Sequence, residues 1–278
     1  MKKRTLQATI IAALAAASCL AAVGSAQAAT LPNLTLTLTN SSITVGGATQ
    51  SGAVNIVTTA TGVKGEASAI LFLLKPGATF EEVEAAIQQA HGEINVTSKY
   101  GSLVFNAEAT SGHTGEAQTY LQPGNYVAVL PGGEGKGSKA HALFTVTPAA
   151  TPAALPTPEA TIRSIEFGFR GPSTLRDGEL VRFENEGFLV HMDVAAPVKN
   201  MKAAKQAIKD LLAGKEKAIE KLISGPPVGF AGSVSHEAFQ QETITAKPGI
   251  YVEACFMDTQ DGRSHTQLGM ERIIKIVK

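Results

Sequence analysis

Short runs of alternating apolar and polar residues recur along this chain. Residues 34–38 alternate leucine with threonine, residues 162–169 form a second near-alternating run, and residues 181–183 continue a third. A period of two places apolar side chains on one face of a strand. Glycine and proline turns separate the runs, and short strands of this kind are typical of a β-sandwich.

Two stretches have helical spacing instead. Residues 79–90 open with Thr79 as a candidate cap, followed by an acidic first turn;. Residues 200–223 carry apolar side chains near helical spacing, and Ala213-Gly214 predicts a break;. Each half of the chain is therefore expected to hold a helix.

The two halves of the chain resemble divergent copies of one another. Residues 123–127 and 248–252 both spell Pro-Gly-x-Tyr-Val, a turn that leads into a strand;. Between the copies lies a Pro/Ala/Thr segment, which predicts a stiff linker;. We predict a domain at 29–148, a linker at 149–160 and a domain at 161–278. The expected fold class is mainly β, with two Greek-key sandwiches carrying inserted helices.

The first residues predict export. Lys2, Lys3 and Arg4 precede an apolar stretch at about 6–23, and Ala26-Gln27-Ala28 offers a cleavage site;. Residues 1–28 are therefore predicted to be a signal peptide, the alternative being an uncleaved anchor. The expected location is the periplasm or the exterior, with no stable membrane span after cleavage, because no later apolar stretch is long enough.

Composition and missing motifs argue against several classes of function. Lys and Arg number 24, as do Asp and Glu, so no polyanionic partner is implied. No basic patch with interleaved aromatic residues suggests nucleic-acid binding. Catalytic motifs such as Gly-x-Ser-x-Gly and His-Glu-x-x-His are missing, and so are the His-x-His pairs of multicopper enzymes;. We expect a monomer that is not an enzyme.

Cleavage would remove Cys19 and leave one cysteine, Cys255, where cysteines normally pair;. Such a thiol is joined to another chain, buried and inert, or bound to metal. The candidate ligand set is His191, Cys255, His265 and Met270. Two imidazoles, a thiolate and a thioether are the donors of a type 1 copper site. The alternative is that each is an ordinary core residue.

Three segments of the second half resemble the cupredoxin family of plastocyanin and azurin. They are Phe183-x-Asn185 running to His191, Pro248-Gly249-x-Tyr251 ending in Cys255, and His265-x4-Met270 with Gly269 before the methionine. The resemblance implies one type 1 copper ion, with His191, Cys255 and His265 as trigonal ligands and Met270 as the weak axial ligand. It also implies that Asn185 and Gly269 shape the ligand loops.

The sequence departs from plastocyanin in places. Nine residues separate Cys255 from His265, where plastocyanin has two, although the type 1 domains of copper nitrite reductases have a similarly long loop. Met192 follows His191 where the family has asparagine, which removes a hydrogen-bonding group. In the first half Leu130 stands at the position of Cys255, so that half is expected to be a degenerate copy without a copper site. We expect His91, His113 and His236 at the surface, although His236 could substitute as a ligand if His265 lies too far away.

The resemblance implies single-electron transfer through an exposed ligand, His265 by analogy, to a redox partner protein. Two alternatives stay open. One is a metal-free scaffold or binding module at the cell surface. The other is copper storage or delivery, with a copper donor as partner.

Overall fold

A computed structural model describes residues 30–63, 66–112, 114–132 and 138–278. The predicted signal peptide at 1–28, including Cys19, and His113 lie outside the described residues. Leu31–Lys278 forms one compact unit. No helix among the described residues is long and apolar enough to cross a membrane.

Strands are the main regular elements of both halves. The first half contains β1 (Asn33–Leu38), β2 (Ile43–Gly47), β3 (Gly52–Ala60), β4 (Glu66–Leu74), β5 (Gly101–Thr110), β6 (Gly115–Leu121), β7 (Gly124–Pro131) and β8 (Ser138–Val146). The second contains β9 (Ala160–Ile165), β10 (Gly168–Arg170), β11 (Thr174–Arg176), β12 (Leu180–Asn185), β13 (His191–Val198), β14 (Val228–Val234), β15 (Phe239–Thr243), β16 (Gly249–Ala254) and β17 (Glu271–Val277). The helices are α1 (Phe80–Gln89), α2 (Met201–Leu212) and α3 (Glu216–Ile219), with the 3-10 helices η1 (Ile94–Lys99) and η2 (His265–Leu268).

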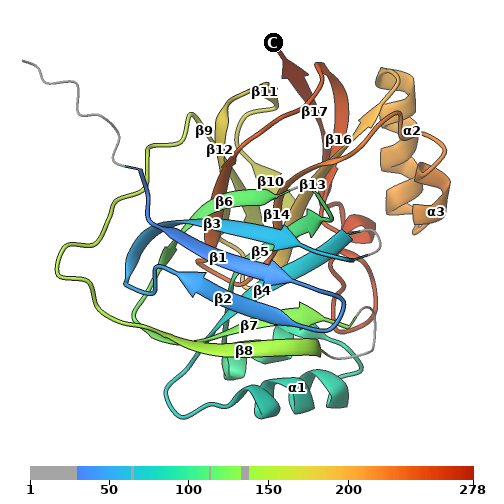
Figure 1. Ribbon diagram of the computed structural model, residues 1–278. Coiled ribbons are helices and arrows are strands. Elements are labelled where there is room, and N and C mark those ends of the chain that lie inside the picture. Colours follow the sequence, from blue (N-terminus) through green and yellow to red (C-terminus); the bar gives the residue numbers. More distant parts are fainter. Residues whose placement is uncertain (1–29, 64–65, 113, 133–137) are drawn as a thin grey trace, which may run out of the picture. The chain divides into compact units, whose positions relative to one another are not determined.

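These strands build two sandwiches, which confirms the predicted β-sandwich class (Figure 1). A long sheet has the order β10-β9-β12-β15-β6-β3-β1-β2 and so takes strands from both halves. A four-stranded sheet, β5-β4-β7-β8, faces it in the first half, and a five-stranded sheet, β11-β17-β16-β13-β14, faces it in the second. Each sandwich buries its own apolar core, one from Leu34 to Val146 and one from Ala160 to Ile276.

The predicted repeat has a structural counterpart. Tyr126 and Tyr251 come from the two Pro-Gly-x-Tyr-Val segments and are both buried. The Tyr126 hydroxyl donates to the Gln122 carbonyl at 2.9 Å, and the Tyr251 hydroxyl donates to the Lys247 carbonyl at 2.7 Å. A tyrosine that bonds back to an upstream carbonyl fixes a corner of a sandwich. The same corner therefore appears in each half.

The halves meet where β15 pairs with β6. Gln241 lies opposite Gln118, and its Nε2 donates to the Gln118 Oε1 at 2.9 Å. The same Nε2 lies 3.1 Å from the carbonyl oxygen of Pro156, and the Ala153 carbonyl accepts from the Ala53 N–H at 2.9 Å. The Pro/Ala segment thus lies against both sandwiches. The domain boundaries at 148 and 161 stay a prediction.

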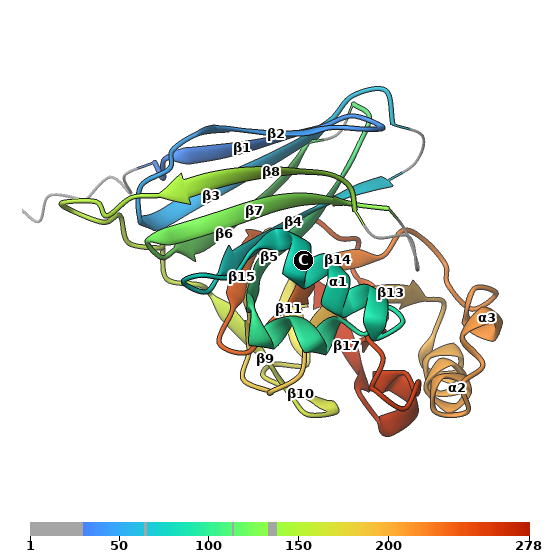
Figure 2. The same ribbon diagram turned by 90° about the horizontal axis from the view of Figure 1, so that it is seen from below.

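Both predicted helices form, with boundaries set by local chemistry. Thr79 caps α1 in a capping box with Glu82;. Asn200 caps α2, which ends at the expected place: Ala213 is its C-cap and Gly214 has φ +66°;. α1 and the α2–α3 pair lie apart from one another (Figure 2), and they pack on different sheets. Phe80 and Val83 of α1 pack against Phe72 and Leu103 of the four-stranded sheet.

Candidate metal centre

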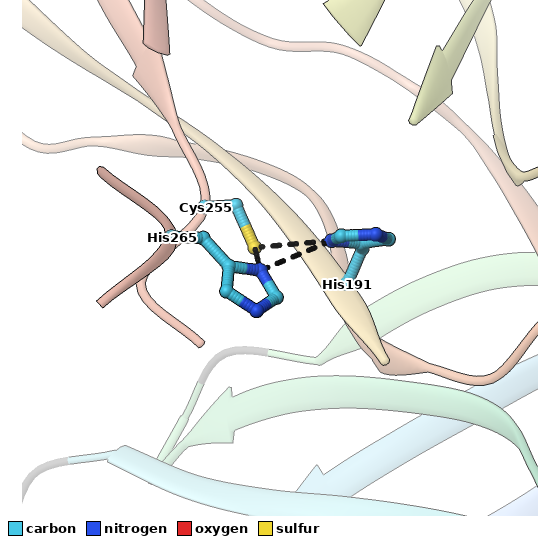
Figure 3. Close-up of side chains that lie close together, drawn as sticks. All are labelled: His191, Cys255 and His265. Atoms are coloured by element: carbon cyan, nitrogen blue, oxygen red, sulfur yellow. Dashed lines mark hydrogen bonds between the residues drawn. The ribbon is translucent and has the colours of Figure 1, made fainter. Parts of the chain in front are cut away.

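Two neighbouring strands bring together residues that are far apart in sequence. His191 begins β13, and Cys255 directly follows the end of β16. The two strands are antiparallel, with Val194 opposite Ala254, so the start of one lies beside the end of the other;. His265 opens η2 after the intervening loop and completes the group (Figure 3).

Three donor atoms converge in this group. The Nδ1 atoms of His191 and His265 are 3.1 Å apart. The Cys255 Sγ lies 3.8 Å from the His191 Nδ1 and 3.4 Å from the His265 Nδ1. All three side chains are fully buried. Among the described residues, this is the one group of three or more His, Cys, Asp or Glu side chains suited to holding a metal ion.

The triangle has the size that a metal ion requires. Zinc, a first-row divalent ion, lies about 2.0–2.1 Å from imidazole nitrogen and about 2.3 Å from thiolate sulfur. At the centre of a trigonal plane, these bond lengths separate the nitrogens by about 3.5 Å and each nitrogen from the sulfur by about 3.8 Å. The observed distances, 3.1, 3.8 and 3.4 Å, are close to these values. Only small side-chain shifts would be needed for coordination.

The electrostatics favour neutral imidazoles. Burial and, to a smaller extent, the neighbouring His265 lower the pKa of His191 to about 3. Burial likewise lowers the pKa of His265 to about 4, against an opposing effect of Glu166. The Nε2 atoms of both rings are buried without a hydrogen-bond partner. Neutral rings whose Nδ1 atoms face one another offer lone pairs to a cation.

The thiol is held in its neutral form until a cation replaces its proton. Burial raises the pKa of Cys255 to about 12, although the Met192 backbone N–H lowers it. That N–H lies 3.4 Å from the sulfur. The family's asparagine side chain is missing at position 192, but the backbone of the same residue still ties the two ligand segments together. The donor set of two imidazoles and one soft sulfur matches copper.

Asn185 shapes the loop that leads to His191. Its Nδ2 donates to the carbonyls of Leu189 and Val234 at 2.8 and 2.9 Å, and its Oδ1 accepts from the Gly187 N–H at 2.9 Å. Asn185 is 1% exposed, so these bonds satisfy groups that water cannot reach;. A Cβ at Gly187 would lie 2.7 Å from the His191 Nε2, which explains the glycine.

Met270 is connected to the centre by two backbone hydrogen bonds. Its carbonyl accepts from the Cys255 N–H at 3.2 Å, and its own N–H donates to the His265 carbonyl at 3.0 Å. Gly269 has φ +94° and caps η2, a turn that favours glycine;. The Met270 side chain is fully buried. Whether it is the axial ligand stays a prediction.

The nine-residue loop between Cys255 and His265 closes on itself. Asp258 bridges to Ser264, and the His265 N–H donates to the Met257 carbonyl at 2.7 Å. The Met257 Sδ lies 3.2 Å from the Ser233 hydroxyl on β14. The length of the loop therefore does not separate its two ends, and it delivers His265 to Cys255.

The expectation that His265 is exposed is wrong. The imidazole is fully buried, and the ring of Phe167 packs edge-on against it with 5.3 Å between centroids. Phe167 lies in the turn between β9 and β10 and has φ +58°. Phe188 at the neighbouring loop is 81% exposed and packs on His236. The Glu166 carboxylate accepts from the backbone N–H groups of Phe188 and Leu189, which joins the turn to the loop.

Sequence reasoning also missed support from the first half. The Asn95 Oδ1 accepts from the N–H of Val190, the residue before His191, at 2.6 Å. Val190 packs in one cluster with Phe72 and Leu103 of the first half, and Met257 packs against the same cluster. No local signal links residue 95 to residue 190, because the contact depends on how the two sandwiches meet. As expected, His91 is exposed and His236 lies outside the ligand group.

A buried charge cluster lies next to the centre. Glu253 precedes Cys255 by two residues and is paired with Arg272. Asp193 follows His191 by two residues, and both carboxyl groups are fully buried. Burial raises the pKa of Asp193, and the neighbouring Glu253 raises it further. Burial also raises the pKa of Glu253, against the opposing effect of Arg272.

No family model and no curated protein matches the chain. Several solved structures do. Auracyanin B is 14% identical with a TM-score of 0.28, and the match covers 45% of this chain and 94% of that one. A reduced auracyanin from Roseiflexus castenholzii is 16% identical with a TM-score of 0.26, covering 42% and 95% of the two chains. The copper-containing nitrite reductase from Thermus scotoductus is 12% identical with a TM-score of 0.26, covering 88% and 67%.

The chain's own residues carry the fold and the site: two β-sandwiches, and in the second a buried His–Cys–His group consistent with one type 1 copper site;.

Proposed function

We propose that this chain binds one copper ion through His191, Cys255 and His265, with Met270 as the weak axial ligand, and carries single electrons. The observation that supports it best is the buried triangle of two Nδ1 atoms and one Sγ within 3.8 Å of one another. Copper bound to such donors supplies a one-electron redox couple.

The residues around the proposed metal centre favour electron transfer over a reaction with a molecule bound at the metal. All three donors are buried, so water is excluded from the centre. The Met192 N–H points at the sulfur and stabilises a thiolate there;. The backbone bonds of Met270 to Cys255 and His265 hold the two ends of the loop together. A site so enclosed and cross-linked suits an ion that stays in place, which favours a carrier over copper delivery.

The structures that match include a blue copper protein and a copper-containing nitrite reductase. We favour a carrier because the sequence has only six histidines and none of the His-x-His pairs that multicopper enzymes use. The signal-like residues 1–28 support export to the periplasm or the exterior, where a redox protein would be the partner. The first half then serves as a support for the centre.

The decisive experiment is a Cu(II) titration of the protein followed by visible absorption, with Cys255→Ser and His236→Ala in parallel. We expect an intense thiolate-to-copper band that saturates at one equivalent. It should vanish in Cys255→Ser and persist in His236→Ala, because His236 is a nearby histidine outside the ligand group. A reversible one-electron wave in voltammetry would support electron transfer. Absence of the band would contradict the proposal and favour a metal-free scaffold. Survival of the band in Cys255→Ser would also contradict it, because the thiolate would then not be a ligand.

A further inference from the structure

A large cavity lies between the first half and the Cys255–His265 loop. Its volume is about 950 Å³, within the range of small-molecule sites;. One wall is a face of α1, formed by Phe80, Val83, Glu84, Ile87 and Gln88. These positions follow the i, i+3, i+4, i+7, i+8 spacing of a single helix face. The helix thus presents one continuous surface to the cavity.

The other walls are mostly apolar. Phe72 and Leu103 of the four-stranded sheet lie on one side, and Phe256 and Met257 of the Cys–His loop lie on another. Phe256 is 38% exposed although it is a large apolar residue. Aromatic and aliphatic walls of this kind favour an apolar ligand, because contact removes their surface from water.

Carboxylates outnumber cationic side chains in the described lining of the cavity. Glu84, Glu93 and Asp258 line it beside the imidazole of His91, and no Lys or Arg belongs to the described lining. The Glu84 Oε1 accepts from the Ser138 N–H at 3.1 Å, and the Glu93 Oε1 accepts from the Asn95 N–H at 2.7 Å. Two of the carboxylates are therefore held at the cavity by hydrogen bonds to neighbouring segments. A cation is favoured there over an anion of equal size.

We infer that this cavity binds an apolar organic cation, such as an aromatic or alkyl ammonium compound. The apolar walls take the body of the ligand, and the carboxylates of Glu84, Glu93 and Asp258 take its charge. Phe256 and Met257 immediately follow the ligand residue Cys255, so an occupied cavity contacts the segment that shapes the metal centre. The inference itself does not depend on copper, because none of the cavity walls is a proposed metal ligand.

The test uses two ions of nearly equal size and opposite charge, tetraphenylphosphonium and tetraphenylborate. Each is titrated into the metal-free full chain by calorimetry. We expect the cation to bind at least tenfold more tightly than the anion. Because copper is left out, failure here leaves the proposed copper site untouched, and failure of the copper titration leaves this result untouched.

Paired variants on α1 locate the site. Glu84→Gln should weaken cation binding severalfold, whereas Glu81→Gln, an exposed residue outside the lining, should leave it unchanged. Gln88→Trp places a large ring in the cavity and should abolish binding of the cation, whereas Gln89→Trp should not. Both glutamines are exposed, so neither change threatens the core. Equal affinity for the two ions, no measurable binding, or equal effects within a pair would overturn the inference.

Discussion

Phe167 combines an unfavourable backbone with a specific contact. A positive φ costs a residue with a Cβ roughly 1–2 kcal/mol, and bulky residues seldom adopt it. Phe167 has φ +58° and packs against the buried His265. Strain of this kind is typical of functional sites, where the surrounding structure maintains it. The ring covers the side of the metal centre that the β9–β10 turn reaches.

Two substitutions separate the strain from the contact. Phe167→Ala and Phe167→Gly both remove the ring, but only glycine relieves the positive φ. We expect the glycine variant to be more stable than the alanine variant by about 1 kcal/mol in urea unfolding. In copper-loaded protein both should speed the loss of the blue band to a chelator. Equal stabilities would contradict the strain argument, and unchanged chelation would contradict the covering role.

Glu242 makes stability depend on pH. It is partly buried on β15, and this burial raises its pKa to about 8. A carboxyl with a raised pKa stabilises the fold fully below its unfolded-state pKa, and that stabilisation is lost as pH rises through the folded-state pKa. The free energy of unfolding should therefore fall between about pH 4.5 and pH 8.

Glu242→Gln should flatten that slope and make the protein more stable than the wild type above pH 8. The measurement is urea unfolding at several pH values. Glu116→Gln on the exposed face of β6 is the control and should keep the wild-type slope. A variant that keeps the wild-type slope would assign the effect to other groups.

Among the elements, η1 supports the metal centre most directly. Asn95, its second residue, bonds the backbone of Val190, next to the ligand His191. The Cys–His loop rests on the same half through Met257. Both ligand segments are therefore positioned by contacts that their own sandwich does not supply.

Asn95→Ala should lower copper affinity while leaving the ligands intact. Groups that orient metal ligands typically change affinity by about 10–100-fold. The measurement is competition with a copper chelator. Asn40→Ala is the matched control, because Asn40 bonds the Gly62 carbonyl on an exposed loop far along the chain from the centre. An Asn95→Ala affinity equal to that of the control would falsify the supporting role of η1.

At the scale of the whole molecule, the long sheet joins both halves. Beyond the β15–β6 pairing, Ser235 and Leu103 exchange two bonds: the Leu103 N–H donates to the Ser235 hydroxyl at 2.9 Å, and the Ser235 N–H donates to the Leu103 carbonyl at 2.8 Å. Both residues are buried. Separating the halves would leave such polar groups unpaired and expose apolar surface.

The halves should therefore unfold together. Hydrogen exchange read by mass spectrometry across a urea series should give one midpoint for peptides from both halves. The fragment 161–278 expressed alone should be less stable than the same residues in the full chain. Two separate midpoints, or a fragment as stable as the full chain, would mean that each half folds independently.

The sequence alone determined the local features. Alternating residues predicted the strands of β1 and β12, and Thr79 and Ala213-Gly214 marked where one helix begins and another ends. The ligand candidates were also readable, because their residue types are rare in this chain and their spacing resembles that of a known family. Patterns of this kind depend on neighbours in sequence, which is why they can be read without a structure.

Only the tertiary structure decided what surrounds those residues. The burial of His265, the support of Val190 by Asn95 and the cavity beside α1 all depend on contacts between segments tens of residues apart. Such contacts come from the packing of whole sheets, and no local pattern encodes them. The long sheet likewise depends on the pairing of β15 with β6, two strands from different halves of the chain.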